Sequence, residues 1–216
     1  MTDRTEPEKA RRGVPLPDTG GQGEQPREIV YARYKYDPGR PTGRRVFGAK
    51  LSYVVRDTDV AAFVKSRLDG RPLPRHVQTR QPHAHDTERE RQVNIYVGKP
   101  CWVVIELEGA GWHFEAGRPG ITVETGHREN NCDLEHVMPD GTLAGPAGPD
   151  GPGCRLIYFR VQERDDYERQ KFYLHIIRGD KRLDDPDQVD PDIPNDGGKF
   201  PFPFVPDPAT GETLES

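Results

Sequence analysis

The chain has 216 residues, of which only 32% are hydrophobic, and it contains 23 glycines and 22 prolines. A formal net charge of −5 argues against a nucleic-acid-binding protein, which normally presents a basic face. The longest uninterrupted apolar run, Cys101 to Ile105, is far too short to span a bilayer, so we expect no membrane partner. These properties predict one β-rich core flanked by tails that bury too little apolar surface to offset the entropy of ordering them.

The first elements follow a polar segment rich in glycine and proline, residues 1–26, which we expect to be a flexible tail. Alternating apolar residues predict strands over residues 29–36 and 45–56, because successive side chains of a strand leave opposite faces of the sheet. The aromatic residues of the chain have two interpretations. The tyrosines of strand 29–36, together with Trp102, Trp112 and Phe114, either pack in the core or line a ligand groove.

One helix is predicted after these strands. Apolar residues from Val60 to Leu68 recur at three- and four-residue spacing, Thr58 can cap the start, and Asp69-Gly70 supplies a stop. We expect its apolar stripe to lie across one edge or end of the sheet. The connection that follows, residues 71–91, is long and polar, and loops of that length are either functional or mobile.

The most apolar part of the chain is the stretch from Arg91 to Gly109, and the rest of the fold is expected to assemble around it. Period-2 alternation over residues 93–97 and 101–107 predicts strands in the middle of the sheet. Further short strands are predicted at residues 112–114, 121–123, 156–161 and 172–177, and a long loop at 126–154.

Together these patterns predict an all-β, mainly antiparallel fold: a two-layer β-sandwich of seven or eight short strands with one short helix and disordered tails. We expect the sandwich domain to cover residues 27–180. It is flanked by the N-terminal tail, residues 1–26, and by an acidic tail rich in proline and phenylalanine, residues 181–216.

The segment Phe200–Pro206 alternates phenylalanine with proline, which favours an extended path with aromatic rings spaced along it. It is either a tail that lies on its own domain or hangs free, or a docking segment for another protein. We therefore expect a protein partner or a second copy of the chain to bind through this segment or through a sheet edge.

Three cysteines, Cys101, Cys132 and Cys154, form an odd set without CxxC spacing and are expected to be reduced thiols of a cytoplasmic protein. A disulfide between Cys132 and Cys154 is the less favoured alternative in such a compartment. The charged N-terminal residues contain no apolar region of a secretory signal, in agreement with that expectation.

Sequence motifs for catalysis are missing. The chain has no P-loop, no GxGxxG after a strand, no GxSxG and no HExxH. Cys132 and His136, four residues apart, are a candidate thiolate pair, but no third partner is visible. We assign no catalytic residue from the sequence.

The most pointed cluster of functional side chains is Pro82-His83-Ala84-His85, followed by Glu90. On an extended chain the side chains of His83 and His85 project from the same face, which is how an HxH pair binds one metal ion. The alternative is a polar loop whose histidines face water, as the neighbouring polar residues indicate.

This cluster resembles the first motif of the cupins, a double-stranded β-helix family, because His83, His85 and Glu90 have an allowed spacing. His127, followed by Asn131, is similar to the end of the second cupin motif, whereas most glycines of the two motifs are missing. The resemblance implies a divalent transition metal, Fe, Mn or Ni, held by His83, His85, Glu90 and His127.

Two functions are consistent with these observations. The favoured one is a non-enzymatic β-sandwich protein that acts as a binding module or self-associates and needs no cofactor. The alternative is a cupin-like metal-binding enzyme that acts on a small molecule.

Overall fold

The computed structural model describes residues 13–23, 25–36, 47–73, 78–80, 95, 97, 99–109, 111–123, 131–162, 168–178, 181–182, 192–195 and 204–206. Within these ranges the chain consists mostly of strands arranged in three sheets, and α1 (Val60–Leu68) is the one helix. The predicted all-β, mainly antiparallel class with a single short helix is confirmed.

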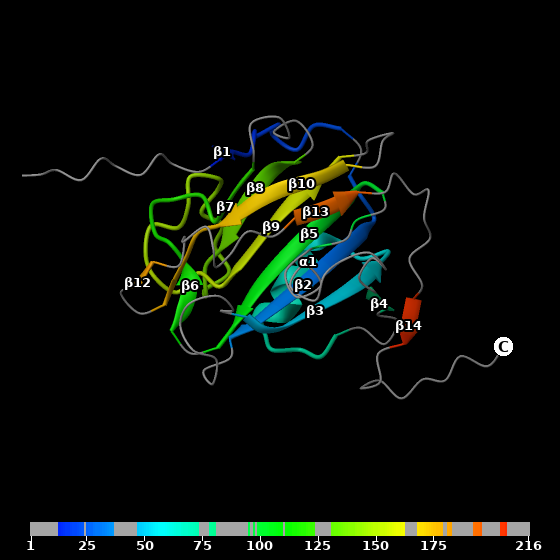
Figure 1. Cartoon of the computed structure of the whole chain (residues 1–216), viewed down its shortest axis with the longest axis horizontal. Helices are drawn as coiled ribbons and strands as arrows, with labels where there is room; N and C mark the ends of the chain where they lie inside the picture. Colours follow the sequence, from blue (N-terminus) through cyan, green and yellow to red (C-terminus); the bar gives the residue numbers. More distant parts are fainter. Residues whose placement is uncertain are drawn as a thin grey trace, which may run out of the picture.

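The largest sheet has seven strands in the order β14-β4-β3-β2-β5-β9-β8. Their bounds are Phe204–Pro206 (β14), Gln78–Arg80 (β4), Phe47–Arg56 (β3), Glu28–Tyr36 (β2), Cys101–Glu108 (β5), Leu156–Val161 (β9) and Asn131–Val137 (β8). All neighbouring pairs are antiparallel except β2 and β5, which are parallel. A parallel pair needs a long crossover, and the chain between these two strands includes α1 (Figure 1).

Two smaller sheets complete the fold. The four-stranded sheet contains β1 (Val14–Pro15), β7 (Ile121–Val123), β10 (Glu168–Leu174) and β13 (Asp192–Asn195), in that order. The three-stranded sheet contains β12 (Lys181–Arg182), β11 (Ile176–Arg178) and β6 (Trp112–Phe114), in that order. The sequence predicted one strand over residues 172–177, but the chain leaves one small sheet and enters the other at His175, whose N–H donates to Gly120 O at 3.0 Å.

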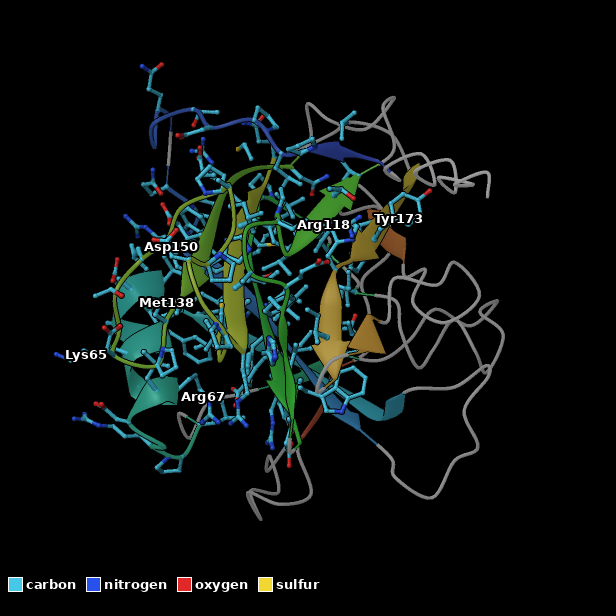
Figure 2. The ribbon with its side chains drawn as sticks, turned by 90° about the vertical axis from the view of Figure 1, so that its left-hand side faces the viewer. Lys65, Arg67, Arg118, Met138, Asp150 and Tyr173 are labelled. Carbon is cyan, nitrogen blue, oxygen red and sulfur yellow. The ribbon has the colours of Figure 1, made fainter. Side chains whose placement is uncertain are left out.

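The seven-stranded sheet has an apolar cluster on each face. One face of β2, with Val30, Ala32 and Tyr34, shares a buried cluster with residues of the small sheets. The opposite face of β2, with Ile29 and Tyr31, packs against α1. Figure 2 shows the resulting layers, with α1 on one side of the sheet and β10 on the other.

The helix covers a face of the sheet, so the expectation that it lies across an edge or end is wrong. Phe63 is 1% exposed and its ring meets the ring of Tyr31 edge to face, with centroids 5.3 Å apart. Burial of one such aromatic side chain stabilises the fold by about 1.5–3 kcal/mol, which holds the short helix on the sheet. The start of α1 is capped by Asp59 and not by Thr58, because Asp59 Oδ1 accepts from Ala62 N at 2.9 Å.

The strand β8 lies inside the segment that was predicted to be a long loop, residues 126–154. Polar residues at Asn131, Asp133 and His136 hide its alternation, and its pairing with β9 is interrupted by a bulge between Cys132 and Glu135. The structure buries these polar groups because each has partners in the fold; for example, His136 Nε2 accepts from Gly120 N at 2.7 Å.

The second half of the central stretch and the free cysteines agree with the prediction. The strand expected over residues 93–97 does not form at its described positions, since Ile95 belongs to no strand and Val97 forms only a bridge. β5 is buried from Cys101 to Ile105 and lies inside the seven-stranded sheet. Cys101, Cys132 and Cys154 are all free and buried, so the disulfide alternative does not occur.

The two expected tails contribute described residues to the fold. Val14–Pro15 forms β1, and Leu16, only 4% exposed, packs in the core, so ordered contacts begin before residue 27. Phe204–Pro206 pairs with β4 at the edge of the largest sheet, and a docking role for Phe200–Pro206 stays a prediction. Among the described residues, no helix has the length and apolar character needed to cross a bilayer.

Candidate functional site

A pocket of about 520 Å³ lies at one end of the seven-stranded sheet, where β2 and β5 begin and β3 and β9 end. Residues 22–23, 25–28, 56–57, 99–100 and 160–162 line it. In Figure 1 the blue segment between β1 and β2 runs around this end of the sheet and supplies one wall. The volume falls within the range of about 300–1,000 Å³ that is typical of small-molecule sites.

The pocket concentrates positive charge in a chain whose net charge is −5. Four cationic side chains line it: Arg27, Arg56, Lys99 and Arg160. Among the described residues, two acidic ones, Glu28 and Asp57, also line it. Arginine and lysine side chains at one concave surface favour anions, and phosphate above all, because they donate charge-assisted hydrogen bonds to its oxygens.

A buried carboxylate holds two of these cations at the mouth of the pocket. The Glu28 side chain is only 5% exposed and accepts from Lys99 Nζ at 2.9 Å and from Arg56 Nε at 3.3 Å. Lys99 and Arg56 are about half exposed, at 52% and 51%. Glu28 therefore fixes both cations where they stay accessible to a ligand.

The fourth cation, Arg160, forms the floor of the pocket and is 3% exposed. Its Nη2 atom lies 2.8 Å from Asp133 Oδ2 and donates to Thr19 Oγ1 at 2.8 Å, and its Nε donates to Cys132 Sγ at 3.4 Å. In the part of the chain that the structure describes, Nη1 makes no hydrogen bond; it lies beside Gly23, in the wall of the pocket. The edge of the guanidinium that carries Nε and Nη2 is thus held, and Nη1 remains available to a ligand in the pocket.

Two backbone positions around the pocket are strained. Asp57 (φ 53°) and Asp133 (φ 56°) are the non-glycine residues with positive φ in the described part of the chain. Asp57 lines the pocket and its N–H donates to Arg27 O at 3.0 Å, while Asp133 holds Arg160. Such conformations cost of order 1–3 kcal/mol and gather at functional sites, where the surrounding structure enforces them.

Cys132 lies next to the pocket floor but is not an activated nucleophile. Burial raises the pKa of its thiol, and the hydrogen bond from Arg160 only partly opposes this effect. Its sulfur accepts from Arg160 Nε and from Gln162 Nε2, at 3.4 and 3.3 Å. The thiol therefore serves as an acceptor that helps to orient Arg160.

The proposed pair of Cys132 and His136 does not form. His136 Nε2 accepts from Gly120 N at 2.7 Å and Nδ1 lies 2.6 Å from Gly145 O, so the ring is the tautomer that carries its proton on Nδ1. Burial lowers the pKa of His136 and keeps the ring neutral. Both ring nitrogens have backbone partners, which leaves neither for the thiol.

The aromatic side chains that the structure describes among the predicted ones belong to the core. Tyr31 and Tyr34 of strand β2 are 0% and 1% exposed, whereas the side chain of Tyr36 lies outside the described part of the structure. Trp102, Trp112 and Phe114 are also buried. The interpretation of these rings as core residues is confirmed.

The predicted metal ligands, His83, His85, Glu90 and His127, lie outside the described residues, and the metal site stays a prediction. Among the residues that the structure does describe, no three histidine, cysteine or acidic side chains come together as a metal site. Measuring the metal content of the purified protein by mass spectrometry tests the prediction, which a protein without bound metal would contradict.

The pocket was not found from the sequence, because its residues come from four segments that only the sheet brings together. A signal was present, however. Arg27 and Lys99 precede apolar strands, Arg56 ends one, and Arg160 lies near the end of another. Cations at strand ends are common on surfaces, and only a pairing scheme shows that these four share one end of a sheet.

The comparison with protein families matches residues 40–198 to the family described as "Predicted novel nucleotide synthetase". The comparisons with curated proteins and with solved structures gave no match. The matched range covers most of the chain and includes Arg56, Lys99 and Arg160, three of the four cations of the pocket.

This finding overturns the expectation of a non-enzymatic binding module, and the cupin-like alternative with it. The chain lacks the short catalytic motifs P-loop, GxSxG and HExxH. That absence does not exclude an enzyme whose binding groups are spread over several strands.

Proposed function

Since the chain belongs to the predicted novel nucleotide synthetase family, we propose that it is a nucleotide-synthesising enzyme and that the pocket at the Glu28 end of the sheet is its active site. The observation that supports this site is the convergence of Arg27, Arg56, Lys99 and Arg160 on one pocket. Substrates and products of nucleotide synthesis carry phosphate groups, and these cations are the side chains that bind phosphate.

The pocket supports a mechanism based on positioning and charge stabilisation. Reactions at phosphorus need groups that orient the phosphate and neutralise the negative charge that develops on its oxygens. Arg160 Nη1, held from behind through Nη2 and Nε, is suited to a fixed contact. Lys99 and Arg56, half exposed, are suited to contacts that form as the substrate enters.

The wall of the pocket supplies groups of a different kind. Gln22, Gln25 and Gln162 present side-chain amides, which both donate and accept hydrogen bonds. Such groups suit the sugar hydroxyls or the base of a nucleotide. In this arrangement the phosphates face the cations and the nucleoside lies toward the glutamines.

An activity assay tests the proposed function. The purified protein is incubated with magnesium and each of ATP, GTP, CTP and UTP, alone and in pairs, and the products are separated by liquid chromatography and identified by mass spectrometry. We expect a new nucleotide product together with released phosphate or pyrophosphate, and the double variant Arg56→Ala/Lys99→Ala should form less of it. Failure of the wild-type protein to bind or convert any of the four would contradict the proposal.

We also propose that the protein works in the cytoplasm. Three buried free thiols, at Cys101, Cys132 and Cys154, support this placement, because reduced cysteines are typical of that compartment. Localisation of a fluorescent fusion by microscopy tests it, and an extracellular signal would contradict it.

A further inference from the structure

The carboxylate of Asp133 joins the floor of the pocket to the segment that makes its wall. Its Oδ1 accepts from the Thr19 backbone N–H at 2.7 Å and from Thr19 Oγ1 at 2.8 Å. Its Oδ2 lies 2.9 Å from the same hydroxyl and 2.8 Å from Arg160 Nη2. A single side chain thus contacts both the N-terminal segment and the buried cation.

The backbone of Asp133 strengthens the same connection. Its N–H donates to Pro17 O at 2.9 Å, so Asp133 holds the N-terminal segment through main chain and side chain together. The residue lies in the bulge of β8 with φ 56°, a left-handed conformation that favours asparagine, aspartate and glycine. The bulge turns this carboxylate toward Arg160, on the neighbouring strand β9.

The anchored segment becomes the pocket wall within a few residues. Thr19 precedes Gln22 and Gly23, which line the pocket, and Gly23 faces Arg160 Nη1. Arg160 Nη2 also donates to Thr19 Oγ1 at 2.8 Å. The contacts among Thr19, Asp133 and Arg160 therefore set both the position of the Arg160 guanidinium and the position of the wall.

We propose that Asp133 is a positioning residue of the nucleotide site: it aims Arg160 Nη1 into the pocket and fixes the wall at Gly23 opposite it. The inference rests on the proposed function, since it assigns Arg160 to a phosphate of the substrate. It extends the site to Pro17 and Thr19, which precede the matched family range of 40–198.

Charge and geometry give opposite expectations for Asp133, and this makes the inference testable. As a negative charge 2.8 Å from Arg160, Asp133 weakens the attraction of the pocket for phosphate. Its removal should tighten phosphate binding if charge alone matters. If Asp133 acts by positioning, its removal should weaken binding, because Arg160 Nη1 and the wall then lose their fixed arrangement.

The experiment measures the dissociation constants of ATP and of inorganic pyrophosphate by isothermal titration calorimetry. Asp133→Asn is the main variant, because asparagine tolerates the left-handed backbone and keeps an oxygen for Thr19 while it loses the charge that pairs with Arg160. Asp140→Asn, in an exposed turn, is the matched control with the same chemical change. Thermal unfolding of each variant reports whether the fold persists.

We expect Asp133→Asn to weaken ATP binding by about tenfold or more, as a misplaced binding group does, and Asp140→Asn to leave it unchanged. Unchanged or tighter binding by a folded Asp133→Asn protein overturns the inference and leaves the proposed function intact. A wild-type protein that binds neither pyrophosphate nor any of ATP, GTP, CTP and UTP overturns both. Should Asp133→Asn not fold, Thr19→Val removes only the hydroxyl contacts; weaker ATP binding by Thr19→Val supports the inference, and unchanged binding overturns it.

Discussion

Two clusters of described residues join an arginine that has little solvent exposure to a carboxylate, and they differ in which guanidinium nitrogens remain available. The first, the pocket cluster, is Thr19, Asp133 and Arg160 at the end of the largest sheet. The second, the helix-face cluster, is Tyr31, Arg67 and Glu106 between α1 and the same sheet. Figure 2 shows Arg67 on the side of α1 that faces the sheet, whereas Lys65 points away from it.

In the helix-face cluster the chain itself uses the charges. Arg67 Nε donates to Glu106 Oε2 at 3.2 Å, Nη1 donates to Arg71 O at 2.7 Å, and the guanidinium lies 5.4 Å from the ring centroid of Tyr31. Tyr31 donates its hydroxyl to the same carboxylate, and burial, followed by the charge of Glu106, raises its pKa. These contacts join the helix to the sheet.

In the pocket cluster the contacts are on one side only. Arg160 uses Nη2 and Nε toward Asp133, Thr19 and Cys132, and Nη1 adjoins a pocket. An ion pair with little solvent exposure, such as Arg67 with Glu106, therefore does not by itself indicate a site. A site is indicated when a fixed cation keeps one donor beside a cavity, as Arg160 does with Nη1.

The largest expected effect is that of Arg160→Ala. The substitution leaves Asp133, 10% exposed, as a buried charge without its partner, so we expect the free energy of unfolding to fall by about 3–5 kcal/mol. ATP binding should be lost as well. Urea unfolding and calorimetry measure the two effects, and a loss of stability with full ATP affinity would show that Arg160 is structural, like Arg67.

Arg67→Ala is the matched substitution in the helix-face cluster. The ion pair is more solvated, with Arg67 12% exposed and Glu106 17% exposed. We therefore expect the free energy of unfolding to fall by a smaller amount, about 1.5–3 kcal/mol. ATP affinity should not change, because this cluster joins helix to sheet at residues that do not line the pocket. A change in ATP affinity with this variant would break the comparison.

Lys99→Ala and Arg56→Ala should separate binding from stability. Both side chains are half exposed, so we expect each to change the free energy of unfolding by less than about 1 kcal/mol. ATP affinity should fall by about tenfold, equivalent to about 1.4 kcal/mol, and this contribution should shrink as salt is raised. Calorimetry at two salt concentrations measures it, with Lys65→Ala on the outer side of α1 as the control.

The smallest effect concerns His136, which is buried and neutral where both clusters are charged. Its pKa in the folded protein is lowered from 6.5, so the unfolded chain takes up the proton first. Stability should therefore fall as pH drops below 6.5, by less than about 1.4 kcal/mol per pH unit. We expect His136→Gln to flatten this slope in urea unfolding between pH 6.5 and 5.

The neighbouring Glu135 has the opposite effect on the pH dependence of stability. Burial raises its pKa, so the folded protein becomes more stable as pH falls and Glu135 is protonated. Because Glu135 is present in both proteins, the difference between wild type and His136→Gln isolates the histidine. Identical slopes in the two would show that His136 is not the group that titrates.

Much of the fold followed from local patterns. The strands β2, β3, β5 and β9 and the helix α1 lie close to their predicted bounds, because their apolar residues keep one period. The strand β8 could not be predicted in this way, because its polar residues fit into a core only when groups from distant segments hydrogen-bond to them. Those groups include Gly120 for His136, and Thr19 and Arg160 for Asp133.

The candidate site followed from local patterns hardly at all. His83 and His85 form a recognisable motif because they are close in sequence. Glu28, Lys99 and Arg160 are each separated by about 60 or more residues along the chain and share no motif. Their proximity depends on the registers of β2, β5 and β9, which place Ile29 beside Trp102 and Trp102 beside Arg160.

The strands β2, β3, β5 and β9 and the helix α1 are encoded locally, since the period of their apolar side chains shows which face is buried. Which strand ends meet depends on the whole fold, because register and strand order involve segments that are far apart in the sequence. The pocket is a product of that register and strand order. Its cations lie at one pocket because β2, β5 and β9 are aligned and the Asp133 side chain contacts Arg160.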